Sequence, residues 1–250
     1  MLALITGASS GMGRDMARIL AKKGYDLILV ARRKERMLEL KKELGTNITI
    51  ISMDLSVEEN CFKLYEKVRN KKIDVLINNA GFGLFGEFVK TDLDTELKMI
   101  DLNIKSYHIL TKLFLQDFVK RDEGYILNVC SSAGFMAGPR LSTYYATKNY
   151  VTKLTMAINE ELRVAKSHVT ISALCPGPVA TEFNEVAHGT FAIREASSYE
   201  VAKYAIDKLF QRKMIIVPTL MMKLTLFFNR LAPYRLSLYI AYKIQMRKSK

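Results

Sequence analysis

Short apolar runs, rich in leucine and β-branched residues, recur along the chain and are separated by longer stretches with helical periodicity. A run that is apolar throughout is typical of a strand buried on both faces of a parallel sheet. Seven such runs occur: Leu2–Thr6, Asp26–Ala31, Ile48–Ser52, Val75–Asn78, Tyr125–Cys130, Val169–Cys175 and Met214–Val217. They predict seven parallel strands.

The stretches between these runs place apolar residues at three-to-four spacing, which predicts amphipathic helices. The predicted helices are Gly13–Lys23, Lys34–Leu44, Glu58–Asn70, Leu97–Lys120, Tyr144–Ala165 and Tyr199–Gln211. Alternation of strands and helices indicates the α/β class. We therefore expect residues 1–217 to form a single Rossmann-type doubly wound domain, whose central seven-stranded parallel sheet is flanked by helices on both faces.

Residues 218–250 predict a basic, amphipathic helical extension packed on or next to that domain. Asn229, Arg230 and Pro233 interrupt it, so no apolar stretch is long enough to span a bilayer. Such helices can lie in a membrane interface, fold over a pocket or pack against a second subunit. The apolar positions at helical spacing are Leu220, Met221, Leu224, Phe227, Phe228, Leu231, Leu236, Tyr239, Ile240 and Ile244.

The composition, with 49% hydrophobic and 25% charged residues, is that of an ordinary globular protein. The formal net charge is +13, and nine of the 38 basic residues lie in residues 211–250, where no acidic residue occurs. This segment is either a solvated basic face or a surface for an anionic partner such as nucleic acid or a membrane. No aromatic-interleaved basic motif accompanies it, so we do not expect nucleic-acid binding.

The three cysteines, Cys61, Cys130 and Cys175, lie far apart without metal-ligand spacing, which argues against disulfides and against a metal site. Their pattern favours a reducing compartment. The first residues lead directly into the first apolar run, without the basic and apolar regions of a signal peptide. We therefore expect a cytoplasmic protein, with peripheral membrane contact through the basic tail as a hypothesis.

A glycine-rich loop joins the first predicted strand to the first predicted helix. Backbone N–H groups and the helix dipole at such a place can bind a pyrophosphate. The spacing differs from the common dinucleotide fingerprint, and a purely structural glycine turn is the alternative. The residues expected to line the cofactor are Gly7, Ser9, Ser10, Gly11, Met12 and Gly13.

The end of the second strand distinguishes the two nicotinamide cofactors, because an acid there binds a ribose hydroxyl and a base accepts a 2'-phosphate. Here the strand runs into Arg32 and Arg33, with no acid at the turn. Arg32 can form a forked contact with a phosphate. This favours NADP(H) over NAD(H), although Arg33 and Lys34 can equally begin a solvated helix.

The next two strand ends also supply cofactor-lining candidates. Asp54, followed by Leu55, can accept a hydrogen bond from an adenine amino group, or can simply close a turn. Asn79, Ala80 and Gly81 follow the fourth strand and would let a ring or ribose pack against the backbone.

Tyr144 and Lys148 lie four residues apart on a predicted helix and therefore share a face. A neighbouring ammonium favours the phenolate, so we expect Lys148 to lower the pKa of Tyr144 and make it a proton donor to a carbonyl oxygen. Ser131, at the end of the fifth strand, can hold the same oxygen. The pair alone is a weak signal, and it gains weight from Ser131 and the glycine loop.

Together these residues resemble the classical short-chain dehydrogenase/reductase family over nearly all of residues 1–217. The matching motifs are residues 6–13, Asp54, residues 78–81, Asn103, Ser131, residues 144–148 and residues 176–181. The resemblance implies a catalytic tetrad of Asn103, Ser131, Tyr144 and Lys148, in which Lys148 also binds the nicotinamide ribose and Asn103 holds a proton-relay water. It also implies that the nicotinamide is covered by Pro176, Gly177, Val179 and Thr181.

The sequence thus predicts an NADPH-dependent carbonyl reductase or alcohol dehydrogenase that works as a homodimer or homotetramer. Its substrate would be apolar or lipid-like, since the loop from Glu182 to Ser198 offers Phe183, Val186, Phe191 and Ile193 as pocket residues or loop anchors. The alternative is a non-catalytic protein, either an NADP(H)-sensing regulator or a membrane-associated binding protein. Complete retention of the tetrad favours the enzyme.

Overall fold

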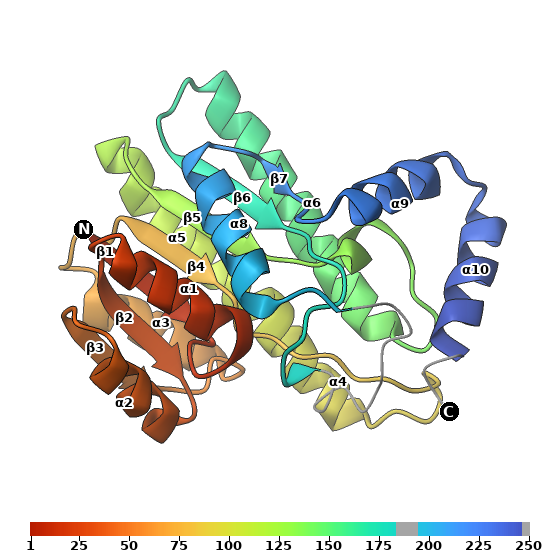
Figure 1. Ribbon diagram of the computed structural model, residues 1–250, viewed down its shortest axis with the longest axis horizontal. Coiled ribbons are helices and arrows are strands. Elements are labelled where there is room, and N and C mark those ends of the chain that lie inside the picture. Colours follow the sequence, from red (N-terminus) through yellow and green to blue (C-terminus); the bar gives the residue numbers. More distant parts are fainter. Residues whose placement is uncertain (184–194, 247–250) are drawn as a thin grey trace.

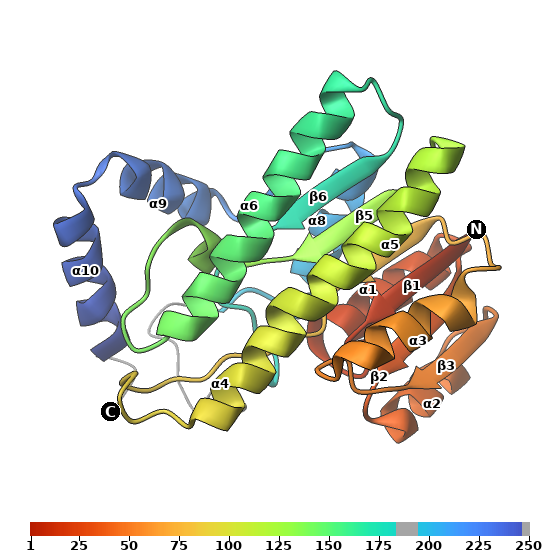
Figure 2. The ribbon, with the colours of Figure 1, turned by 180° about the vertical axis from the view of Figure 1, so that it is seen from behind.

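The computed structural model describes residues 1–183 and 195–246, and its centre is one parallel sheet with strand order β3-β2-β1-β4-β5-β6-β7 (Figures 1 and 2). The seven strands are β1 Leu2–Thr6, β2 Asp26–Ala31, β3 Ile48–Ser52, β4 Val75–Asn78, β5 Tyr125–Val129, β6 Thr170–Leu174 and β7 Ile215–Ile216. The predicted doubly wound fold is confirmed. The last three strands are shorter than their apolar runs.

Helices cover both faces of the sheet because successive strand residues point to opposite sides. In β1, Ala3 and Ile5 join the apolar cluster on one face of the sheet, whereas Leu4 joins the cluster on the opposite face. The helices of this domain are α1 Gly11–Lys22, α2 Lys34–Glu43, α3 Glu58–Val68, α4 Leu93–Ile100, α5 Ser106–Arg121, α6 Ser142–Val164 and α8 Ser198–Phe210.

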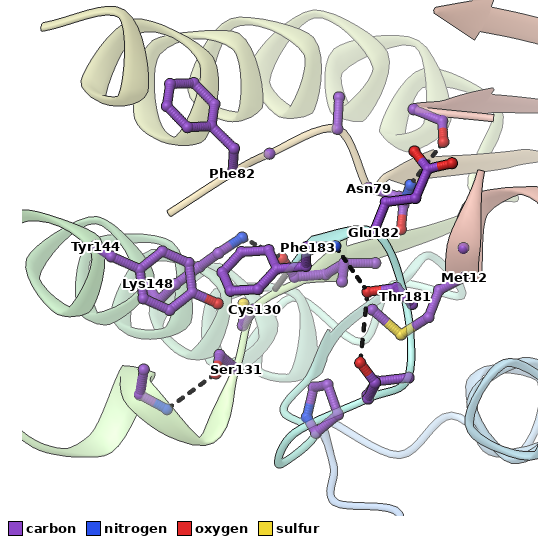
Figure 3. A pocket seen from close by; sticks show the side chains of 18 of the residues that line it. Met12, Asn79, Phe82, Cys130, Ser131, Tyr144, Lys148, Thr181, Glu182 and Phe183 are labelled. Atoms are coloured by element: carbon purple, nitrogen blue, oxygen red, sulfur yellow. Dashed lines mark hydrogen bonds between the residues drawn. The ribbon is translucent and has the colours of Figure 1, made fainter. Parts of the chain in front are cut away.

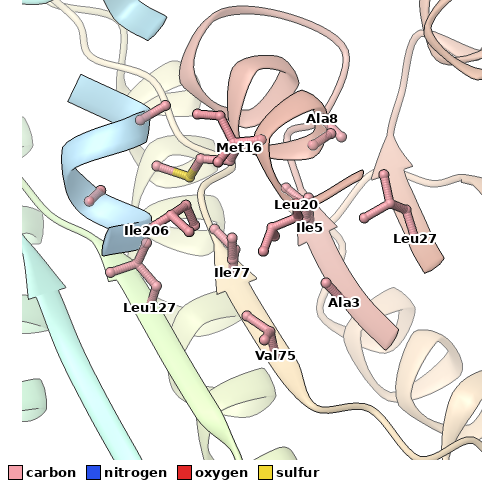
Figure 4. Close-up of a cluster of buried hydrophobic side chains, with 14 of the residues drawn as sticks. Ala3, Ile5, Ala8, Met16, Leu20, Leu27, Val75, Ile77, Leu127 and Ile206 are labelled. Carbon is pink, nitrogen blue, oxygen red and sulfur yellow. The ribbon is translucent and has the colours of Figure 1, made fainter. Parts of the chain in front are cut away.

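The core beneath α1 and α8 supports the cofactor side of the molecule (Figure 4). Met16 and Leu20 of α1 and Ile206 of α8 pack on Ile5 and Ile77 of the central strands, and all five side chains are fully buried. Burying each side chain of this size contributes about 1.5–3 kcal/mol. The start of α1 is therefore held firmly against the carboxyl ends of the strands.

The stretch predicted as one helix from Leu97 to Lys120 is interrupted. A wide π-helical turn, η1 Asp101–Lys105, separates α4 from α5 and contains Asn103. Turns of this kind are frequent at functional sites. Periodicity alone did not predict this turn, because its five residues are too few to show a change in apolar spacing.

The C-terminal segment folds into two helices, α9 Leu220–Leu231 and α10 Tyr234–Met246, which we call the C-terminal arm. Pro233 separates the helices, and Thr219 caps α9 by accepting a hydrogen bond from the Met222 N–H. Within the described residues, no helix is long and apolar enough to cross a membrane. The division of the chain at residue 217 stays a prediction.

Candidate active site

A cavity of about 440 Å³ lies at the carboxyl ends of the strands, between the sheet and the C-terminal arm. Nineteen of the predicted site residues line it, and Gly13 and Asn103 do not. The lining residues are Gly7, Ser9, Ser10, Gly11, Met12, Arg32, Arg33, Asp54, Leu55, Asn79, Ala80, Gly81, Ser131, Tyr144, Lys148, Pro176, Gly177, Val179 and Thr181.

The glycine loop after β1 brings bare backbone to this cavity. Gly7 has φ +65°, and a Cβ there would lie 2.7 Å from Asn79 Nδ2. A Cβ on Gly13 would lie 2.4 Å from the Gly7 carbonyl oxygen, so Gly13 allows close packing beneath the loop rather than contact with a ligand. The side chain of Ser10 does not cap α1, and no acid lies in the first turn. Helix-terminal N–H groups of this kind fit a pyrophosphate.

Asn79 lines the cavity and also braces the glycine loop. Its Nδ2 donates to the carbonyl oxygens of Thr6 and Gly7 at 3.0 and 3.2 Å. The preceding Asn78 is buried and donates to Asn128 Oδ1 at 2.9 Å, which ties β4 to β5. These amides stabilise the cradle into which a dinucleotide would fit.

Positive side chains gather where the cavity passes the end of β2. Arg33 donates to Ser10 Oγ at 2.9 Å and pairs with Glu182 at 2.8 Å, and Arg36 pairs with the same carboxylate. The Arg36 and Arg33 guanidinium groups lower the pKa of Glu182. Arg32, the preferred phosphate ligand at the sequence level, is more exposed and lies 3.9 Å from an Asp54 oxygen.

Arg36 and Glu182 were not among the predicted site residues. Arg36 lies three positions after Arg33 in the first turn of α2, so helical spacing is the signal that could have found it. Glu182 comes from a distant loop, and no local pattern indicates its ion pairs. Asp54 does close a turn, because its Oδ1 accepts hydrogen bonds from the Ser56 N–H and hydroxyl at 3.0 and 2.8 Å.

Ser131, Tyr144 and Lys148 come together at the opposite end of the cavity (Figure 3). Ser131 follows β5, and its Oγ accepts a hydrogen bond from the Ala133 N–H at 3.1 Å. Lys148 Nζ donates to the Val129 carbonyl oxygen at 2.9 Å and lies 5.9 Å from the centre of the Tyr144 ring. The phenol and the serine hydroxyl face the same space, where a carbonyl oxygen can be held.

The expected depression of the Tyr144 pKa is wrong for the protein on its own. Burial raises the pKa of Tyr144 above its usual value, and a hydrogen bond with Ser131 opposes that rise only in part. Burial also lowers the pKa of Lys148 to about 8. Lys148 is buried and Tyr144 is partly buried in the cavity wall, so the charged form of each is disfavoured. Sequence spacing contains no measure of this desolvation.

Asn103 is fully buried behind the cavity rather than in its wall. Its Oδ1 accepts from the Phe82 N–H at 3.1 Å, and its Nδ2 donates to the Phe82 carbonyl oxygen and to Thr147 Oγ1 at 2.9 and 3.1 Å. These bonds join η1 to the loop after β4 and to α6. The relay water expected at Asn103 stays a prediction.

The remaining wall near Tyr144 is apolar and was largely missed at the sequence level. The ring of Phe183 lies 5.2 Å from that of Tyr144, and Gln245 of α10 donates to the Tyr145 hydroxyl at 3.1 Å. Val186, Phe191 and Ile193, the other candidates in that loop, lie outside the described residues. The additional lining residues are Phe82, Met136, Leu141, Tyr145, Met222, Thr225, Ala241, Ile244 and Gln245.

Two cysteines lie beside this site, and both are buried. Cys130 lines the cavity but is only 3% exposed, and Cys175 at the end of the adjacent strand is fully buried. Among residues 1–183 and 195–246, no group of three His, Cys, Asp or Glu side chains is arranged to hold a metal ion.

Known proteins with similar sequences are dehydrogenases and reductases, in agreement with the geometry of the cavity. Residues 1–192 match the family model described as short chain dehydrogenase. Dehydrogenase/reductase SDR family member 11 of Bos taurus is 33% identical over 213 residues, covering 81% of this chain and 84% of that protein. NADP-dependent 3-hydroxy acid dehydrogenase YdfG of Escherichia coli is 34% identical over 192 residues, covering 74% and 76%.

Two solved structures are also similar. A short-chain dehydrogenase from Sphingobium yanoikuyae in complex with NADPH is 30% identical, with a TM-score of 0.81 and 88% of each chain covered. The bulky-bulky ketone specific alcohol dehydrogenase from Comamonas testosteroni is 28% identical, with a TM-score of 0.78 and 92% of each chain covered.

The fold and the match over most of the chain define the class of protein: the chain belongs to the short-chain dehydrogenase/reductase family. It is an NAD(P)-dependent oxidoreductase that acts on a small-molecule substrate.

Proposed function

We propose that this protein is an NADPH-dependent carbonyl reductase that also runs in reverse as an alcohol dehydrogenase. The observation that carries the proposal is the meeting of Ser131, Tyr144 and Lys148 at one end of a cavity whose other end fits a dinucleotide. NADPH, when bound there, supplies the hydride. The proposed residues of this chain bind and orient the substrate and deliver the proton.

In this proposal the Ser131 hydroxyl holds the substrate carbonyl oxygen beside the Tyr144 hydroxyl, which donates the proton. Lys148 keeps its ammonium close to the phenol and binds the cofactor ribose. Asn103 acts at a distance, because its bonds to Phe82 and Thr147 set the position of the helix that carries both Tyr144 and Lys148.

We propose that NADPH is preferred because the turn after β2 carries Arg32 and Arg33 and no acid of its own. The nearest carboxylate, Glu182, comes from a distant loop and pairs with Arg33. Arg33 is held over the glycine loop by Ser10 and Glu182, and Arg32 is largely exposed, with only a long ion pair to Asp54. Guanidinium groups bind a 2'-phosphate through charged hydrogen bonds. The NADPH complex of the Sphingobium protein and the NADP-dependent Escherichia coli relative support this preference.

We propose an apolar carbonyl compound as substrate, because the wall near Tyr144 is built from side chains such as Phe183, Leu141 and Met222. The bulky-ketone specificity named for the Comamonas protein supports this choice. The protein would work in the cytoplasm as a homodimer or homotetramer. Sedimentation analysis of the purified protein checks the oligomeric state.

The test is NADPH oxidation across a panel of ketones, aldehydes and acyl-chain carbonyl compounds. We expect turnover with apolar ketones, and a roughly thousandfold loss of kcat in Tyr144→Phe, because general acid catalysis of this type contributes about 10²–10⁴-fold. Tyr150→Phe, an exposed tyrosine on the same helix, is the matched control and should retain activity. NADPH binding without turnover of any carbonyl compound would support a sensor instead.

A further inference from the structure

The outer face of α9 is an apolar surface without a protein partner among the described residues. At 100° per residue, its exposed apolar positions fall within one stripe of about 120°. Met222 points to the opposite side, where it is only 6% exposed and lines the active-site cavity. The stripe, each member of which is at least half exposed, consists of Leu220, Met221, Leu224, Phe227, Phe228 and Leu231.

The second helix of the arm also exposes apolar side chains. Tyr239 and Ile240 of α10 are 60% and 48% exposed, whereas Gln245 on the inner side is buried against Tyr145. Figures 1 and 2 show α9 and α10 extending together from one end of the sheet, on the side of the molecule away from β2 and β3.

The charges on the arm have one sign. Its described part carries Lys223, Arg230, Arg235 and Lys243, and residues 211–250 contain no Asp or Glu. Elsewhere, exposed apolar side chains lie among mixed charges, as on α3, where Glu59, Lys63 and Glu66 surround Phe62. A contiguous exposed apolar face marks an interaction site, and the lack of acids indicates an anionic partner.

We propose that the C-terminal arm docks on the surface of an anionic phospholipid bilayer. The apolar stripe of α9 would enter the interfacial region while the basic side chains contact lipid phosphates, as amphipathic basic helices do. A second copy of the chain fits less well. In a symmetric dimer the same surface faces itself, which would bring like charges together.

This docking brings the active-site cavity to the membrane. The inner sides of the same two helices contribute Met222, Thr225 and Ala241 to the cavity wall, so lipid and cavity lie on opposite sides of one thin arm. This step rests on the proposed function: an apolar carbonyl compound dissolved in the bilayer could pass the arm and reach Tyr144.

The first experiment measures co-sedimentation of the full chain with phosphatidylcholine vesicles, and with vesicles in which phosphatidylglycerol replaces part of the phosphatidylcholine. We expect binding to the anionic vesicles and roughly tenfold weaker binding to the neutral ones. The double variant Phe227→Glu/Phe228→Glu should lose the binding by about tenfold or more, because it places charges in the apolar stripe. The matched control is Phe62→Glu on α3, which should bind as the native chain does.

The charge requirement has its own pair of variants. Lys223→Glu/Arg230→Glu should remove the preference for anionic vesicles, whereas Lys63→Glu/Lys67→Glu on α3 should keep it. Co-sedimentation that is equal for native and Phe227→Glu/Phe228→Glu protein, or absent for the native chain, overturns the proposal. The proposal is also overturned if the native chain does not bind vesicles and Phe227→Glu/Phe228→Glu lowers the oligomeric size. That result would assign the apolar stripe to contact with a second copy of the chain.

A separate readout distinguishes this proposal from the proposed function. NADPH-dependent turnover of a small water-soluble ketone should be unchanged in Phe227→Glu/Phe228→Glu, which also reports correct folding. Loss of vesicle binding with retained turnover supports the docking. Vesicle binding without turnover of any carbonyl compound would leave the docking standing and reject the reductase.

Discussion

The two walls of the active-site cavity are built in different ways. The cofactor wall consists of strand ends and the glycine loop, held by buried amide bonds such as those from Asn79 to the Thr6 and Gly7 carbonyl oxygens. The wall formed by the arm is attached to the body of the protein by the packing of Met222 and by isolated polar contacts, among them Gln245 to the Tyr145 hydroxyl and Arg140 to Met246. A change in the first wall should therefore disturb fold and catalysis together, and a change in the second should alter substrate binding alone.

The largest effect is expected at Lys148 of α6, which lies at the reaction end of the cavity and belongs to neither wall. Lys148→Met should lower kcat by about a thousandfold, since it removes the charge beside the proton donor. It should also stabilise the protein at neutral pH by up to about 3 kcal/mol, because burial lowers the pKa of Lys148 from 10.5 to about 8 and the buried ammonium costs folding energy.

The destabilisation caused by the buried Lys148 ammonium depends on pH. Below pH about 8 the cost of the ammonium is fully present, and it disappears as the pH rises towards 10.5. Urea unfolding of native and Lys148→Met protein should thus show a difference at neutral pH that shrinks at high pH. Lys153→Met, an exposed lysine on the same helix, is the control. A pH-independent difference would contradict the assigned burial cost.

The second prediction concerns the packing of the glycine loop. Gly13→Ala would place a Cβ 2.4 Å from the Gly7 carbonyl oxygen, which is too close for the loop to keep its position. Overpacking of this kind costs about 1–3 kcal/mol, and NADPH affinity should fall by tenfold or more. Thermal unfolding and NADPH titration measure both quantities. Gly45→Ala is the control, because nothing lies within 4 Å of its added Cβ, and it should match the native protein.

A smaller effect is expected for the arginines at the end of β2. Arg33→Ala should weaken NADPH binding by about tenfold and NADH binding little, because loss of one charged hydrogen-bond donor costs about 1.5–3 kcal/mol. The same measurement on Arg32→Ala shows how much of the NADPH affinity depends on the more exposed neighbouring arginine. Titration with both cofactors gives the ratio for each variant, and equal losses for NADPH and NADH would remove the proposed preference.

The smallest effect is expected on the arm. Gln245→Leu removes the hydrogen bond to the Tyr145 hydroxyl, which is worth about 1 kcal/mol, and leaves the sheet untouched. The KM for apolar ketones should change severalfold while kcat stays within about twofold. Steady-state kinetics measure this split. A fall in kcat comparable to that of Lys148→Met would show that the two walls are not independent.

The amino-acid sequence by itself determined the seven-stranded parallel sheet and the elements that point to its chemistry. Strands buried on both faces are apolar throughout, so runs such as Leu2–Thr6 and Val75–Asn78 mark their own limits. The spacing of Tyr144 and Lys148 places both on one helix face for the same local reason.

Tertiary structure alone decided the ion pairs of the site, the pKa of Tyr144 and the orientation of the arm. These features depend on contacts between distant residues and on removal from water. Glu182 holds Arg33 over the glycine loop from nearly 150 positions away. The raised pKa of Tyr144 follows from burial that no spacing records. The arm was predicted as helices, but which of their sides covers the cavity and which is exposed is set by packing of Met222 and Gln245 against the body of the protein.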